Sequence, residues 1–235
     1  MRWHIYLCTA AALSLSASVS VAASWTLDDI RTKIAEQYEA VDGNMLQYRY
    51  QTHATVERPG EDTVQQVTDF DPSREPGTKE QLILVDGEAP DADSLQEFAR
   101  RPQPDEREEQ RIRLTIQYDT LELVEERAEH LVFRFQPELL VNGSPDSDGA
   151  NFTGQLTFDR QNNYLTRVEI SATEEFSKLF FRIRKFDVLE EFYWADNRLL
   201  RQTYYHDLNL RNALVNASNE ITMSFDYPEL ELAQR

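Results

Sequence analysis

The chain has 235 residues, of which 42 are Asp or Glu and 24 are Lys or Arg, so its formal net charge is −18. A negative field of this size repels nucleic acid, and we therefore expect no nucleic-acid partner. The lone cysteine, Cys8, lies in the N-terminal apolar segment, which excludes a disulfide framework or a thiolate metal site in the rest of the chain.

The first 23 residues predict a secretory signal peptide. Arg2 and His4 precede the uncharged run Ile5–Val21, and Val21-Ala22-Ala23 is a small-residue cleavage pattern. We expect cleavage after Ala22 or Ala23, with no integral membrane segment remaining. A membrane anchor is the alternative, but the run is only marginally long enough to span and contains four serines. Residues 24–235 are then long enough for a single antiparallel β domain with its own core.

An amphipathic helix is predicted over Thr26–Val41. Thr26 can cap it, Asp29 can complete a capping box, and Gly43 suits a left-handed helix end. Its apolar residues recur at steps of three and four and form one stripe: Leu27, Ile30, Ile34, Tyr38 and Val41.

The pattern changes to a period of two from Leu46 to Val56, which predicts a long strand with one apolar face. A second strand is expected at Thr63–Phe70 and a third at Leu82–Val85, before a turn at Asp86-Gly87. Pro90-Asp91 then introduces a short helix.

A charged connecting segment is predicted over Arg100–Arg113. The rest of the chain is predicted to be a succession of strands, with a polar loop over 142–149. The predicted strands are Ile112–Tyr118, Leu121–Arg127, His130–Gln136, Phe152–Asp159, Leu165–Ala172, Leu179–Leu189, Arg198–Leu210 and Glu220–Tyr227. Because no βαβ repeats intervene, neighbouring strands should pair as an antiparallel meander. The predicted fold class is mainly β (α+β): a large curved antiparallel sheet or incomplete β-barrel with an N-terminal helix and one short helix.

A sheet with one apolar face must cover that face with a helix, a second sheet or a ligand. Two short helices can cover only part of it, so a leftover apolar concavity is one expectation and closure into a filled barrel is the other. The candidate ligand-binding residues are large and apolar and lie on this face: Tyr48, Tyr50, Phe133, Phe135, Phe158, Phe181, Ile183, Met223 and Phe225.

No residue set identifies a reaction. His53, His130 and His206 are far apart and lack zinc-binding spacing, and neither a GxSxG elbow nor a phosphate-cradling glycine loop occurs. Two of the many carboxylates could form a pair for glycoside hydrolysis, but because carboxylates are so abundant, the sequence does not identify such a pair. We expect no catalytic residues, no metal and no cofactor, and classify the chain as a non-enzyme.

The stretch Phe70-Asp71-Pro72, Gly77 and Leu82–Pro90, followed by Leu95 and Phe98, resembles a block in uncharacterised exported proteins of Gram-negative bacteria. Those proteins are similar in build to the lipoprotein-carrier (LolA/LolB-like) superfamily. This sequence differs from the group at Gln81, near a position where the group often has an aromatic residue. It implies an incomplete β-barrel whose concave face, partly lidded by helices, accommodates acyl chains or a hydrophobic partner segment.

Two functional hypotheses follow. The first is a soluble periplasmic binding or carrier protein for a lipid, lipoprotein or other apolar ligand held in a concave sheet. The alternative is an envelope protein-protein interaction factor without a small-molecule pocket.

Overall fold

A computed structural model of the chain describes residues 26–101, 112–141, 144–178, 181–212, 217–228 and 230–232. The predicted signal peptide lies outside the described residues, as does most of the Arg100–Arg113 connection. In the described part, the protein is mostly β, with two α-helices and fifteen strands. None of its helices is both long enough and apolar enough to cross a membrane.

The N-terminal helix α1 spans Leu27–Met45. Thr26 caps it and forms the predicted capping box, because its side chain accepts from the Asp29 N–H while the Asp29 carboxylate accepts from the Thr26 N–H. The predicted end at Gly43 is wrong, since the helix continues to Met45. Met45 is 4% exposed and extends the buried stripe by one turn from Val41, which favours the longer helix.

The other elements follow in chain order. Their bounds are β1 (Tyr48–Glu57), β2 (Val64–Phe70), β3 (Glu80–Val85), α2 (Ala92–Ala99), β4 (Ile112–Ile116), β5 (Glu122–Glu126), β6 (His130–Phe135), β7 (Pro137–Val141), β8 (Ser144–Asp146), β9 (Phe152–Asp159), β10 (Tyr164–Ala172), β11 (Phe176–Lys178), β12 (Phe181–Ala195), β13 (Arg198–Asn212), β14 (Ala217–Asp226) and β15 (Leu230–Leu232).

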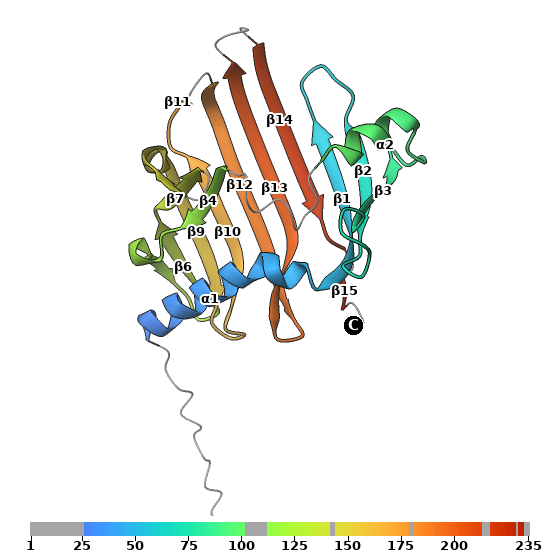
Figure 1. The fold of residues 1–235 in the computed structure, drawn as a ribbon. Helices are drawn as coiled ribbons and strands as arrows, with labels where there is room; N and C mark the ends of the chain where they lie inside the picture. The colour runs from blue at the N-terminus through green and yellow to red at the C-terminus, as the bar shows by residue number, and fades with distance from the viewer. Residues whose placement is uncertain are drawn as a thin grey trace, which may run out of the picture.

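Twelve of these strands form one antiparallel sheet, in which ten follow the order β3-β2-β1-β14-β13-β12-β10-β9-β6-β5. Strand β11 pairs with β12, and β15 pairs with β1. The predicted meander is confirmed along most of this order, while the N-terminal hairpins join the sheet beside β14, near the end of the chain (Figure 1). The end strands β3 and β5 do not pair, so the sheet is not closed and the expectation of an incomplete barrel is confirmed.

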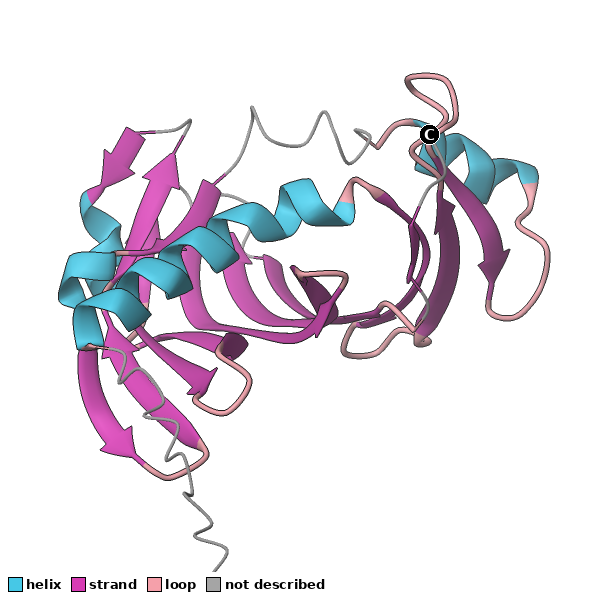
Figure 2. Ribbon diagram, turned by 90° about the horizontal axis from the view of Figure 1, so that it is seen from below, coloured by secondary structure: helices cyan, strands magenta, loops and turns pink. Residues whose placement is uncertain are grey.

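The sheet is strongly curved, and α1 lies inside the curve (Figure 2). The helix packs chiefly against β13 and β10. We call the face of the sheet that carries α1 the concave face and the other the convex face.

A small second sheet, in the order β4-β7-β8, was not predicted. The stretch expected to be a polar loop over 142–149 contains β8, which pairs with β7. Pro137 is the first residue of β7, and Pro145 lies in β8, an edge strand of the small sheet. A strand tolerates proline, which has no N–H, at its first residue or at the edge of a sheet. Because both prolines argue against a strand in the sequence alone, this sheet was missed.

Candidate apolar ligand site

Helix α1 covers one part of the concave face and completes a packed core there. Ile34 on the helix is fully buried, as are Phe133 and Val168 on the sheet. The amide of Gln37 bonds to the backbone of the β9–β10 hairpin: its oxygen accepts from the Leu165 N–H at 2.9 Å and its nitrogen donates to the Asn163 carbonyl at 3.1 Å. This part of the concave face is therefore closed to a ligand.

A part-buried charged network fixes α1 to the sheet. Arg201 on β13 donates to Glu190 on β12 at 2.8 Å and to Asp42 on α1 at 3.0 Å, while the Tyr38 hydroxyl donates to Glu190 at 2.9 Å. Burial and the Glu190 carboxylate raise the pKa of Tyr38 well above its ordinary value, which keeps its hydroxyl protonated as a donor. Burial lowers the pKa of Arg201, but the neighbouring carboxylates outweigh it and raise that pKa well above the usual value.

Beyond α1, the concave face of β12, β13 and β14 carries half-buried side chains, and we call this surface the open patch. Strand pairing places Phe186 opposite Leu208, Leu208 opposite Ile221, and His206 opposite Met223, so these side chains share one face. The open patch consists of Ile183, Phe186, Tyr204, His206, Leu208, Ile221, Met223 and Phe225.

The open patch is small. At the usual rise and spacing of strands, its backbone positions extend about 20 Å along β13, from Tyr204 to the level of Ile183, and about 10 Å across three strands, or roughly 200 Å². A stable protein–protein interface needs about 800 Å² on each partner. The patch therefore has the dimensions of an alkyl chain or a small apolar ligand.

Aromatic rings connect the core to the open patch. The Phe152 ring on β9 contacts Phe186 at 5.3 Å between centroids, and Phe186 contacts the His206 ring at 4.9 Å. Tyr204 continues the row to Phe225 at 5.8 Å. These contacts form a continuous row of aromatic rings along the concave face from β9 to β14.

His206 brings an imidazole into the open patch. Its Nε2 atom is buried and has no hydrogen-bond partner within the described ranges. Burial lowers the pKa of His206, and the Asp207 carboxylate opposes that shift only in part, so the imidazole is neutral at pH 7.

The structure divides the predicted ligand-binding residues into two groups. Ile183, Met223 and Phe225 lie together in the open patch, and Phe181 lies in β12, although its side chain is outside the described part. The remaining residues belong to the core, with exposures of 8% or less: Tyr48, Tyr50, Phe133, Phe135 and Phe158. Ligand contact stays a prediction for both groups, but only Ile183, Met223 and Phe225 are described on an open surface.

Sequence reasoning missed Phe186, His206 and Leu208. The register between β12 and β13 shifts between Ile183 and Lys185, where Arg184 is the extra residue of a bulge. Strict alternation from Ile183 assigns Phe186 to the convex face, whereas the bulge returns it to the concave face. His206 and Leu208 alternate with polar residues on β13, a signal that could have identified them.

The structure does not bring together the three histidines considered for zinc, because His53 lies on β1, His130 on β6 and His206 on β13. Among the described residues, no group of three or more His, Cys, Asp or Glu is placed to hold a metal ion.

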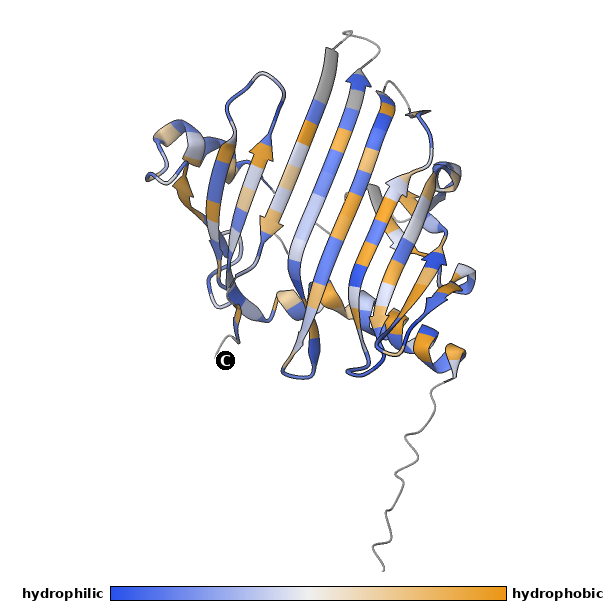
Figure 3. Cartoon of the chain, turned by 180° about the vertical axis from the view of Figure 1, so that it is seen from behind, coloured by the Kyte–Doolittle hydropathy of each residue, from blue (hydrophilic) through white to orange (hydrophobic). Residues whose placement is uncertain are grey.

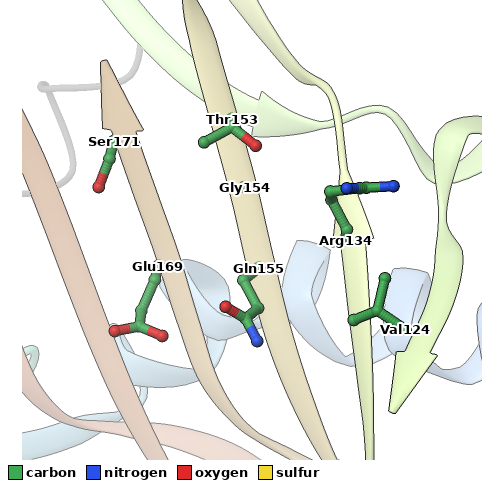
Figure 4. A pocket seen from close by; sticks show the side chains of 7 residues that line it. All are labelled: Val124, Arg134, Thr153, Gly154, Gln155, Glu169 and Ser171. Atoms are coloured by element: carbon green, nitrogen blue, oxygen red, sulfur yellow. The ribbon is translucent and has the colours of Figure 1, made fainter. Parts of the chain in front are cut away.

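A depression of about 400 Å³ lies on the convex face, with α1 visible behind the strands (Figure 4). Five of its seven lining residues are polar or charged, and one of these, Arg134, is paired with Glu122 at 2.7 Å. Its lining residues are Val124, Arg134, Thr153, Gly154, Gln155, Glu169 and Ser171. This composition does not suit an apolar ligand. The same convex side shows alternating hydrophobic and hydrophilic bands along the strands, as expected for a sheet with two different faces (Figure 3).

No protein-family model and no curated protein matches the chain. Among solved structures, the chain is similar to a LolA superfamily protein from Nitrosomonas europaea, with 12% identical residues, coverage of 90% of this chain and 96% of that chain, and a TM-score of 0.32. The resemblance of the block from Phe70 to Phe98 implies the same superfamily. A TM-score of 0.32 is too low to support a functional argument, which must come from the residues of the chain itself.

Proposed function

We propose that the chain is an exported, periplasmic binding or carrier protein for a lipid, lipoprotein or other apolar ligand, which it holds against the open patch. The observation that carries this proposal is the half-buried aromatic and aliphatic surface that α1 leaves uncovered on the concave face. Removing such surface from water is favourable, at about 25 cal/mol per Å² of apolar area. The binding free energy of a ligand that covers the patch therefore includes the burial of the patch and the burial of the ligand's own apolar surface.

Size and charge support a small apolar ligand. The patch is several-fold smaller than one side of a stable protein interface, which favours an alkyl chain over a folded partner. Arg201, a cation at the border of the patch, is already paired with Glu190 and Asp42. The described part of the patch thus offers aromatic and aliphatic contacts rather than an ion pair, and burial would supply most of the affinity.

Export is part of the proposal and rests on the predicted signal peptide. Expression of the full chain in a Gram-negative host, followed by intact-mass analysis of the periplasmic fraction, would locate the cleavage site. Cleavage after Ala22 or Ala23 is expected. Recovery of the uncleaved chain in the membrane fraction would contradict it.

Native mass spectrometry of the purified periplasmic protein, followed by solvent extraction and lipid analysis, tests the ligand. We expect a bound apolar species in the wild type and its loss in the Met223→Glu variant, because a carboxylate in the open patch is costly to desolvate. Ser224→Glu is the matched control, since Ser224 is the next residue on β14 and lies on the convex face. Consistently ligand-free protein, or equal retention in both variants, would contradict the proposal and leave a protein-interaction factor as the better reading.

A further inference from the structure

We propose that His206 selects the ligand of the open patch by hydrogen bonding to a neutral hydroxyl or ester oxygen on an otherwise apolar molecule. This inference rests on the proposed function and narrows its ligand from any apolar molecule to a neutral amphiphile.

The position of His206 places a hydrogen-bonding group in the middle of an apolar surface. It lies on β13 between Val188 of β12 and Met223 of β14, which are its register partners. Its ring contacts Phe186 at 4.9 Å and Tyr204 at 6.4 Å between centroids. Aromatic and aliphatic neighbours of this kind offer no replacement for the hydrogen bonds that the imidazole makes with water.

The Nε2 atom is buried without a partner among the residues that the structure describes. Leaving a buried polar atom unsatisfied costs about 1–3 kcal/mol, and native proteins contain few such atoms. A phenylalanine at this position would keep the ring contacts without that cost. The imidazole is thus unfavourable for the unliganded fold and becomes favourable when a ligand oxygen completes its hydrogen bonding.

The charges around the open patch favour a neutral oxygen over a carboxylate or phosphate. The imidazole is neutral at pH 7, Arg201 is engaged by two carboxylates, and Glu190 lies on the same face as His206, opposite Tyr204. An anionic headgroup would meet Glu190 without finding an unpaired cation in the described part of the patch. Met223 is unbranched and has several rotatable bonds, so it can move to give a ligand access to the imidazole.

Competition against N-phenyl-1-naphthylamine, a neutral apolar fluorophore, tests the inference. Wild-type protein should bind 1-dodecanol about fivefold more tightly than n-dodecane, the ratio that corresponds to one typical net hydrogen bond. In His206→Phe this ratio should fall to one or below, because the dodecanol hydroxyl then has no partner, while dodecane binding persists. His53→Phe is the matched control, because His53 is exposed on β1 and faces away from the concave side, and it should keep the wild-type ratio.

The outcomes distinguish a failure of the proposed ligand binding from a failure of the proposed role of His206. Failure of the wild type to bind either probe contradicts the proposed function itself. Binding of both probes with the same ratio in wild type and His206→Phe leaves the function standing and overturns the role of His206. Equal weakening of both probes in His206→Phe also overturns it, since the residue then contributes packing alone, and tighter binding of dodecanoate than of dodecanol overturns the preference for a neutral oxygen.

Discussion

A substitution at Gly154 on β9 tests the side-chain packing beneath α1 on the concave face. It is paired with Phe135 on β6, and a Cβ built at Gly154 would overlap with the Phe135 ring. Phe135 is 2% exposed, so its ring cannot move without disturbing its neighbours. Overpacking of this kind costs about 1–3 kcal/mol, whereas alanine in place of glycine in a strand regains about 0.5–1 kcal/mol. Gly154→Ala should therefore lower the free energy of unfolding by about 1–2 kcal/mol.

The effect of Gly154→Ala on the free energy of unfolding should reverse in sign when the Phe135 ring is absent. Phe135→Ala alone should cost about 3–5 kcal/mol through its cavity. In that background the methyl of Gly154→Ala has space, so the second substitution should be neutral or stabilising by up to about 1 kcal/mol. Urea unfolding followed by circular dichroism gives all four free energies of the cycle, provided that the m-value stays constant. An equal penalty for Gly154→Ala in both backgrounds would refute the assignment of Phe135 as its steric partner.

Other parts of the structure give predictions that the same unfolding assay can check. Arg201→Leu removes one partner of a buried ion pair and should cost about 3–5 kcal/mol, while the double variant with Glu190→Leu should recover part of that loss; no recovery would show that the pair is not coupled. Gly43→Ala adds a methyl within α1 where no atom lies within 4 Å, and it should stabilise the protein by up to about 1 kcal/mol; a loss of stability would contradict the helical assignment there. Burial lowers the pKa of His206, partly offset by Asp207, so the folded state resists protonation and loses stability as the pH falls below about 6.5, the ordinary histidine value. His206→Phe should lack this component between pH 7.5 and 5.5, and an identical pH dependence in both proteins would contradict it.

Local patterns predicted local structure well. The capping residues Thr26 and Asp29 located the start of α1, and the predicted strand Phe152–Asp159 has the observed bounds of β9. Asp196 and Asn197 form a tight hairpin turn, as predicted, with positive φ angles of 51° and 60°. These features depend on residues that are close in sequence, so the sequence contains the information that defines them.

Long-range arrangement was harder to predict. Pairing of β1 with β14 joins segments from opposite ends of the chain, and no local pattern encodes it. The bulge at Arg184 changes which residues of β12 face inward, although only one residue is added. The predicted strand Leu179–Leu189 also ends six residues before β12 does at Ala195, because Glu190 and Glu191 interrupt the apolar pattern. Glu190 is tolerated in the middle of the strand because Arg201 and Tyr38 satisfy its carboxylate.

The distinction between core and candidate site depends on how far one helix reaches. Phe133 and Phe225 obey the same alternating pattern, yet the first is fully buried and the second is half-buried. Helix α1 has 19 residues and is about 28 Å long and about 10 Å wide, whereas β12 and β13 have 15 residues each and are about 50 Å long. A helix that lies across such strands covers about a fifth of their length, and strand β7 of the small sheet contacts β9. The apolar side chains of β12 to β14 beyond α1 therefore remain half-open, because the element that would cover them is too narrow to reach them.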